Sequence, residues 1–338
     1  MARFVALLAA VLALLVAACG GSGDTDTPKD PVQNVPEESG ARERVKVAVA
    51  PDEAEFPAAD GKTLEELAST MAAGPSLGMA TSIFTTGDPS RMAFGVIGAD
   101  GKPVYGPTAI YVAPTPSDPA EGPFVAPADV LLTDARYRSK QAATEQDPFA
   151  AIYAANVKFP KRGQYAVLSA TKLPDGKFTG ATGQVQVSTE DADPIPAVGD
   201  KAPKVETDTL ETTKGNQEIL DTRVPPSDMH EVSFADVAGK EPVALLFATP
   251  QLCASRVCGP VADIALQLQA KYGKQMKFIH QEVYVDNDVS KGLREPLREF
   301  NLPSEPWLFI VDKSGKITAR LEGSIGVQQF EDANKTGL

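Results

Sequence analysis

The distribution of apolar residues divides the chain into four stretches. Phe4 to Ala18 is an uninterrupted apolar run, and residues 20–44 hold few apolar side chains. In residues 45–187, short and partly alternating apolar runs are separated by Pro- and Gly-containing turns, which is typical of β-strands. From residue 204 onward, strand-length apolar runs alternate with apolar residues at helical spacing. The pattern predicts a leader, a disordered polar tether, a β domain and an α/β domain.

Several strands are predicted in the β domain. They lie at residues 91–97, 104–112, 151–157, 164–169 and 182–187. The first two flank a Gly- and Pro-containing turn at residues 98–103, which predicts a β-hairpin. Short strands at this spacing favour a β-sandwich over residues 45–187. The arrangement resembles the immunoglobulin-like modules of extracellular bacterial proteins.

Two further features of the β domain follow from its residues. Thr63 and Glu66 have the spacing of a capping box, which predicts a helix over residues 63–72. Phe94, Tyr105 and Tyr111 fall within or beside the predicted strands, and we expect these rings in the core.

The last part of the chain has a regular order of elements. Strands are predicted at 242–248, 276–285, 307–311 and 317–321, and helices at 261–272, 293–300 and from 330 onward. The order is therefore β-α-β-α-β-β-α. Residues 188–203 contain several prolines and acids, which predicts a linker between the two domains.

The leader begins with a basic residue, Arg3, and its apolar run ends at Val16-Ala17-Ala18, directly before Cys19. Its apolar run is shorter than the about 20 residues that span a bilayer, and it has the proportions of a signal-peptide core. The ending resembles the bacterial lipoprotein signal. That resemblance implies a signal peptide at 1–18, lipid on Cys19 and a tether over 19–44, with the protein on the extracytoplasmic face of the cell membrane. The alternative is an ordinary secretory signal with a chance cysteine.

The net charge of the chain is −13. Binding to nucleic acid requires clustered Lys and Arg, so the charge argues against a nucleic-acid partner. It argues equally against electrostatic docking on anionic lipid. The acidity is interpreted as a source of solubility.

Two segments of the α/β part match a known family. Glu305 to Ile317 resembles the P-x-x-F-h-h-D-x-x-G-x-I segment (h, apolar) of extracytoplasmic thioredoxin-like proteins. Val198 to Pro203 resembles the G-x-x-A-P entry segment of the branch that contains membrane-anchored thiol–disulfide proteins and peroxiredoxins. The resemblance covers roughly residues 198–338 and implies a thioredoxin fold, an α/β domain, over residues 204–338. It also implies that Pro306 is a cis-proline facing a pair of active-site cysteines.

The cysteines that remain after Cys19 are Cys253 and Cys258. The resemblance implies that they exchange disulfides with protein thiols, with Cys253 attacking and Cys258 resolving. Aligning on Cys258-Gly259-Pro260 would reverse the roles. We predict a reversible disulfide, with the helix-terminal thiol of Cys258 the more acidic, because a helix N-terminus stabilises a thiolate.

The pair departs from the family motif. Four residues separate the cysteines instead of two, Leu252 replaces a tryptophan, and Leu246 occupies the position of the family's buried aspartate. The wider ring predicts a bond that is harder to reduce, and the missing acid predicts a slow resolving step.

Two other interpretations of the pair remain open. The first is a permanent structural disulfide in a non-catalytic binding or scaffold lipoprotein. The second is a metal site of two thiolates and a histidine, but His280 falls in a predicted core strand, and Ser304 stands near the position where the family's histidine would be. Peroxidase activity is disfavoured because Pro250 stands where a Thr or Ser is needed. No cofactor and no metal site are predicted.

Overall fold

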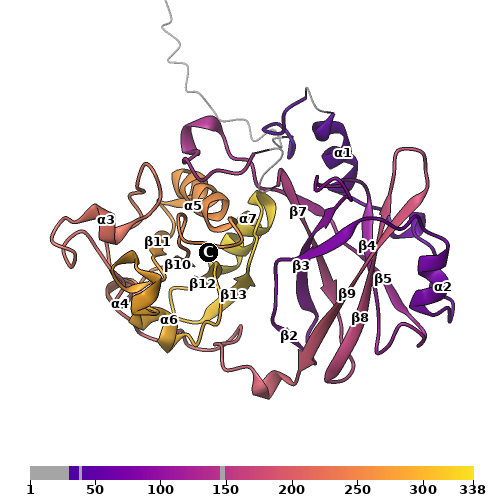
Figure 1. The fold of residues 1–338 in the computed structure, drawn as a ribbon. Helices are drawn as coiled ribbons and strands as arrows, with labels where there is room; N and C mark the ends of the chain where they lie inside the picture. The colour runs from indigo at the N-terminus through magenta and orange to yellow at the C-terminus, as the bar shows by residue number, and fades with distance from the viewer. Residues whose placement is uncertain (1–29, 38–39, 145–148) are drawn as a thin grey trace, which may run out of the picture. The chain divides into compact units, whose positions relative to one another are not determined.

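Three β-sheets organise residues 30–37, 40–144 and 149–338, which are the residues described by this computed structural model (Figure 1). The predicted leader and Cys19 lie outside the described residues. Among the helices that are described, none is long and apolar enough to cross a membrane.

The predicted tether is shorter in the structure. Val32 and Val35 are fully buried, and Asn34 Nδ2 donates to the carbonyl of Leu132 at 3.3 Å. Helix α1 (Ala41–Ala48) begins inside the predicted tether and buries Val45. A few apolar residues at suitable spacing therefore anchor this segment, although its composition is mostly polar.

The β part consists of two sheets whose strands pair antiparallel, except for one short pair. The first sheet has the order β1 (Ser76–Met79), β3 (Ser90–Ile97), β7 (Ala151–Val157) and β6 (Ala128–Val130). The second has the order β2 (Phe84–Thr85), β9 (Phe178–Ser188), β8 (Gly163–Lys172), β4 (Thr108–Ala113) and β5 (Glu121–Val125), with β2 parallel to β9. Side chains of both sheets meet in one hydrophobic cluster. The strands predicted at 151–157, 164–169 and 182–187 are confirmed.

The hairpin predicted between residues 91–97 and 104–112 is only partly formed. The backbone closes the turn, since Gly98 N–H donates to the Lys102 carbonyl at 2.8 Å and Val104 N–H to the Val96 carbonyl at 2.8 Å. However, β3 and β4 belong to different sheets. After Val104 the chain crosses to the other sheet through Tyr105–Pro107. The predicted hairpin therefore ends at the contact between Val96 and Val104, and the prediction is wrong beyond it.

The capping box is confirmed. Helix α2 (Leu64–Ser69) has Thr63 as its N-cap, the Thr63 hydroxyl accepts from Glu66 N–H, and the Glu66 carboxylate accepts from Thr63 N–H. The aromatic core is confirmed as well. Phe94 and Tyr111 are fully buried and Tyr105 is 4% exposed, and Phe94 stacks on Tyr153 with ring centroids 5.5 Å apart.

The α/β part has the predicted order of elements. Strands β10 (Val243–Phe247), β11 (Lys277–Gln281), β12 (Trp307–Val311) and β13 (Ile317–Glu322) alternate with helices α5 (Cys258–Tyr272), α6 (Glu295–Glu299) and α7 (Val327–Gly337). The sheet order is β11-β10-β12-β13. β10 runs parallel to β11 and antiparallel to β12, and β13 runs antiparallel to β12. This order and these directions define a thioredoxin-like fold.

Alternate residues of β10 face opposite layers. Leu245 and Phe247 pack in a cluster with Phe300, at the end of α6, while Leu246 packs in a second cluster with residues of α5 and α7. The sheet is therefore covered on both faces, as expected for a strand that is apolar throughout. The remaining short helices are α3 (Gln217–Leu220), α4 (Phe234–Val237) and the 3-10 turns Glu53–Glu55, Ala135–Tyr137, Glu190–Ala192, Val285–Asn287 and Val289–Lys291.

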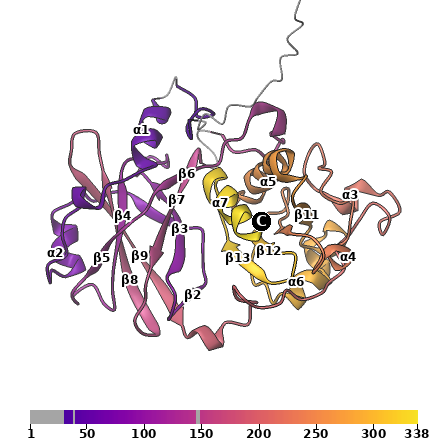
Figure 2. The ribbon, with the colours of Figure 1, turned by 180° about the vertical axis from the view of Figure 1, so that it is seen from behind.

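The predicted linker at 188–203 is largely exposed but is held to the α/β part at particular residues. Ile195 is 3% exposed, and Lys201 forms an isolated bridge with Lys316 of the last hairpin. In addition, α7 packs beside β6, and the Asp129 carboxylate accepts from the N–H groups of Gln328 and Gln329 (Figure 2). Folding of the two parts as independent domains stays a prediction.

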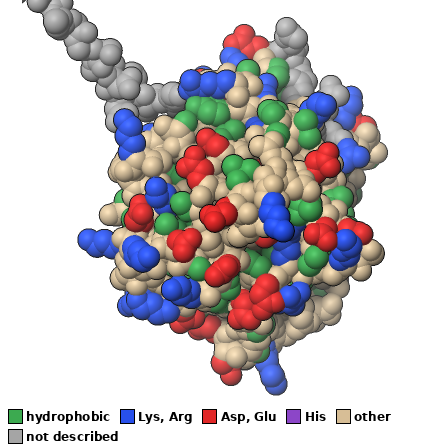
Figure 3. Space-filling model, turned by 90° about the vertical axis from the view of Figure 1, so that its left-hand side faces the viewer, with side chains coloured by type: hydrophobic (Ala, Val, Ile, Leu, Met, Phe, Trp, Pro, Cys, Tyr) green, Lys and Arg blue, Asp and Glu red, His purple; other side chains and the backbone are tan. Residues whose placement is uncertain are grey.

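One face of the surface illustrates the charge distribution. In Figure 3, acidic and basic side chains are interspersed over that face among uncharged ones. The excess of acidic residues is thus not gathered there into a single patch.

Candidate redox site

The two thiols lie at the carboxyl end of the central strand β10. A loop leads from Phe247 to Cys258, which is the first residue of α5. The loop turns back at Thr249, whose carbonyl accepts from the N–H groups of Leu252 and Cys253. Both cysteines are free thiols in the structure; Cys253 is 7% exposed and Cys258 is fully buried. The carboxyl ends of strands are where open α/β sheets place their sites.

The start of α5 is fixed by a close approach of the backbone. The carbonyl oxygen of Gln141 lies 2.3 Å from the position that a Cβ on Gly259 would take, so only glycine fits next to Cys258. Four residues further along α5, the Asp263 carboxylate accepts from Ser139 N–H at 2.9 Å. A segment that enters from the β part therefore packs on the N-terminal turn that carries Cys258.

The thiol of Cys253 is the acidic one. A hydrogen bond from the Cys258 thiol, followed in importance by one from the Ser255 hydroxyl, lowers the pKa of Cys253 to about 6 against the opposing effect of burial. Ser255 Oγ lies 3.2 Å from Cys253 Sγ. The backbone N–H groups of Val257 and Cys258 also stabilise this thiolate. Cys253 is therefore largely ionised at neutral pH.

The thiol of Cys258 behaves in the opposite way. Burial, and then its role as donor to Cys253, raises the pKa of Cys258 well above the ordinary value. The prediction that the helix-terminal thiol is the more acidic is wrong. Its physical premise was sound, because N–H groups at the start of α5 do stabilise a thiolate, but they serve the sulfur of Cys253.

The Glu305–Pro306 peptide bond is cis, as the family resemblance implies. Glu305 is half-buried, and burial together with the charge of Cys253 raises the pKa of its carboxyl to about 7. Tyr284 also lies within electrostatic range of Glu305 and both thiols. The structure thus brings Cys253, Cys258 and the cis-proline loop together.

Leu246 is buried in β10, so the family's internal aspartate has no counterpart at that position. A different buried acid lies nearby. Glu282 is fully buried after β11, and its Oε1 accepts from both the N–H and the hydroxyl of Thr222 at 2.7 Å. The Thr222 hydroxyl in turn accepts from Gln251 N–H in the cysteine loop at 3.2 Å. Glu282 is therefore connected to the loop through one threonine.

Among the described residues, neither histidine is grouped with Cys253 and Cys258 as a possible set of metal ligands. His280 lies in β11 and directs Nε2 to the Ala248 carbonyl at 2.9 Å and Nδ1 to Asp221. The Ser304 hydroxyl accepts from Trp307 Nε1 at 3.2 Å. The site as described is equipped for thiol chemistry: an ionised thiolate, a protonated second thiol and a carboxyl that titrates near neutrality.

Sequence reasoning missed Ser255, Tyr284 and Glu282. Ser255 could have been noticed, because it lies between the cysteines in a short loop. Tyr284 and Glu282 follow β11, and only the parallel pairing of β11 with β10 brings them to the loop.

Comparison with known proteins gives likenesses to solved structures. No protein-family model and no curated protein sequence matches the chain. A putative thiol:disulfide interchange protein DsbE from Chlorobium tepidum is 19% identical, with a TM-score of 0.30 over 41% of this chain and 99% of that one. The thioredoxin domain of a thiol-disulfide oxidoreductase from Bacteroides vulgatus is 20% identical, with a TM-score of 0.27 over 41% and 94%. A PKD domain of a human VPS10 domain-containing receptor is 15% identical, with a TM-score of 0.17 over 37% and 80%.

Proposed function

We propose that the protein is a lipid-anchored, extracytoplasmic thiol–disulfide exchange protein that acts through Cys253 and Cys258. The observation that carries the proposal is the difference in acidity between the two thiols. Cys253, which is 7% exposed, has a pKa of about 6, and the fully buried Cys258 keeps its proton. Exchange requires a nucleophile that is ionised near ambient pH and a second thiol that stays protonated until the resolving step.

The reaction has two steps in the direction of client reduction. The Cys253 thiolate attacks one sulfur of a client disulfide, which forms a mixed disulfide and releases the other client sulfur as a thiolate that takes up a proton. Cys258 then loses its proton, and its sulfur attacks Cys253 Sγ. The Cys253–Cys258 disulfide forms, the client leaves as a dithiol, and two electrons have passed to the client. The reverse sequence oxidises a client dithiol.

Glu305 is suited to accept the proton that Cys258 loses. Its pKa of about 7 lets the carboxyl both accept and release a proton near neutral pH, which is the condition for general acid–base catalysis. It would serve in place of the internal acid that is missing at Leu246.

The reduction potential of the pair tests this function. We expect a value within the range of exchange proteins, about −120 to −270 mV, when the purified protein is equilibrated with glutathione redox buffers. A potential below about −300 mV would identify a structural disulfide and favour the binding or scaffold alternative. Thiols that never pair under oxidant would refute exchange through this pair.

Membrane attachment is the second part of the proposal. Val16-Ala17-Ala18-Cys19 supports lipid on Cys19. A metabolic lipid label should enter the wild-type protein and be absent from Cys19→Ser, and the variant should leave the membrane fraction. A wild-type protein that takes up no label contradicts the anchor.

The two-sheet part is proposed to be an immunoglobulin-like module that presents the redox part to its clients. Support comes from the antiparallel pairing within two sheets that share one core. An experimental structure of residues 45–187 with another connection of the strands would contradict this assignment.

A further inference from the structure

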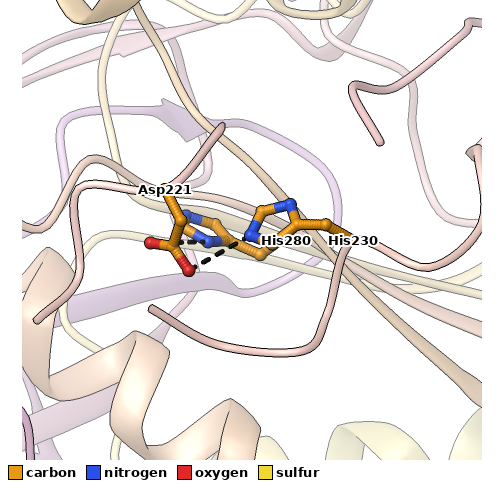
Figure 4. A group of neighbouring side chains, drawn as sticks. All are labelled: Asp221, His230 and His280. Carbon is orange, nitrogen blue, oxygen red and sulfur yellow. Dashed lines mark hydrogen bonds and ion pairs between the residues drawn. The ribbon is translucent and has the colours of Figure 1, made fainter. Parts of the chain in front are cut away.

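A second cluster of ligand-type side chains lies in the thioredoxin-like part. Asp221 follows α3, His230 lies in the segment between α3 and α4, and His280 lies in β11. Their exposed fractions are 5%, 2% and 0%. Figure 4 shows both imidazole rings beside the Asp221 carboxylate. The sequence predicts no metal site here, because His230 and His280 are far apart along the chain and only the fold brings them together.

The spacing of the three side chains is that of ligands around one ion. His230 Nε2 lies 3.1 Å from Asp221 Oδ2, and His280 Nδ1 lies 3.6 Å from Asp221 Oδ1. One ligand atom from each side chain can be chosen so that all lie within 4.8 Å of one another. Ligands at about 2.1 Å from a tetrahedral Zn²⁺ are roughly 3.4 Å apart. Small shifts therefore suffice to place one ion between them.

Two of the three side chains, His280 and Asp221, are oriented by outer hydrogen bonds as metal ligands usually are. His280 donates from Nε2 to the Ala248 carbonyl, which directs Nδ1 into the cluster, and Nδ1 has no hydrogen-bond partner there. The Asp221 carboxylate is held by Arg223 N–H at 2.8 Å and by the N–H and hydroxyl of Ser227 at 2.7 and 2.8 Å. Histidine ligands that donate to a backbone carbonyl, and carboxylate ligands that are themselves hydrogen-bonded, are the usual outer-shell pattern.

A pocket gives access to the cluster. Its volume is about 80 Å³, and Asp221 and His230 form part of its lining. Asp228 and Glu231, both exposed, also line it. Their negative charges attract a cation to the opening, and the pocket leaves room for a water molecule as a further ligand.

We propose that Asp221, His230 and His280 bind one divalent transition-metal ion. Two imidazoles and one carboxylate suit Zn²⁺, Co²⁺ and similar borderline ions, and Mg²⁺ or Ca²⁺ poorly. The site is separate from the thiol pair and does not depend on the proposed exchange activity. The same distances would also fit an Asp–His cluster that is held by hydrogen bonds without a metal ion. The test below distinguishes the two arrangements.

The test uses the full chain with Cys253→Ser and Cys258→Ser, so that the thiolates of the pair cannot bind metal. Zn²⁺ titration by calorimetry should give one ion per chain. Co²⁺ should give visible d–d absorption without a sulfur-to-cobalt charge-transfer band. Adding His230→Ala or His230→Gln should weaken Zn²⁺ binding at least about tenfold.

Two controls keep the result interpretable. His230→Gln keeps a polar group beside Asp221 and serves where His230→Ala fails to fold, and thermal unfolding without metal reports the fold of each variant. Asp286→Asn removes an exposed acid outside the cluster and should leave Zn²⁺ binding unchanged. No Zn²⁺ binding by the double-serine chain, or binding that His230→Gln leaves unchanged, would overturn the proposal.

Discussion

Cys253→Ser is expected to reduce disulfide exchange to the uncatalysed rate, whereas Cys258→Ala should leave the first step and block the second. The reason is that Cys253 supplies the attacking thiolate and Cys258 the resolving thiol. With a model protein disulfide as client, Cys258→Ala should accumulate a mixed disulfide on Cys253, visible by mass spectrometry. Cys253→Ser should accumulate none.

The two replacements of Cys258 provide a matched control for the hydrogen bond. Serine keeps a donor toward Cys253, and alanine removes it. A hydrogen bond to a charged group is worth about 1.5–3 kcal/mol, so the pKa of Cys253 should rise toward the ordinary value for cysteine in Cys258→Ala and rise less in Cys258→Ser. Mixed disulfides trapped on Cys258 in Cys253→Ser would reverse the assigned roles.

Arg223→Met is expected to destabilise the protein by about 3–5 kcal/mol. Arg223 Nε donates to Asp263 Oδ1 at 2.9 Å, and the side chains of this ion pair are 2% and 1% exposed. Removing the guanidinium leaves the carboxylate of α5 buried without its cation. Denaturant unfolding at neutral pH measures the loss.

An exposed ion pair serves as the control. Arg298 and Glu295 pair at the surface with side chains 54% and 64% exposed, so Arg298→Met should cost about 0–1 kcal/mol. Losses of equal size in the two variants would contradict the importance of the buried pair.

The defect of Arg223→Met should also depend on pH. Burial raises the pKa of Asp263 against the lowering effects of Ser139 and Arg223, so this carboxyl takes up its proton at a higher pH in the folded chain than in the unfolded chain. The stability that this group contributes is present at acidic pH and is lost as the pH rises through its folded-state pKa. Without Arg223 the carboxyl is easier still to protonate, and the difference from wild type should therefore shrink as the pH is lowered.

The order of the α/β elements could be predicted because continuous apolar runs mark its strands. Every residue of β10 is buried, and such a strand is recognisable without knowledge of its neighbours. The capping box of α2 is likewise a local signal, carried by Thr63 and Glu66 alone. Elements that a local sequence pattern specifies by itself could therefore be predicted correctly.

Features that depend on contacts between distant segments could not be predicted. The turn at 98–103 was visible, but the departure of the chain to a second sheet after Val104 was not. The acidity of Cys253 depends first on the hydrogen bond that it accepts from the Cys258 thiol and then on the Ser255 hydroxyl and nearby N–H groups, and sequence spacing leaves open which sulfur is the acceptor. The cluster of Asp221 with His230 and His280 depends on a contact between distant segments, because His280 N–H in β11 donates to the Met229 carbonyl next to His230 at 3.0 Å.

The central claim is that Cys253 is the ionised nucleophile of the pair. The most direct test is alkylation of the fully reduced, full-length protein with iodoacetamide across a range of pH, with the modified cysteine identified by peptide mass spectrometry. The account predicts that Cys253 reacts first and that its rate rises with a midpoint near its pKa of about 6, while Cys258 stays protected in the folded protein. Preferential modification of Cys258, or a Cys253 midpoint near the ordinary value of about 8.5, would contradict it.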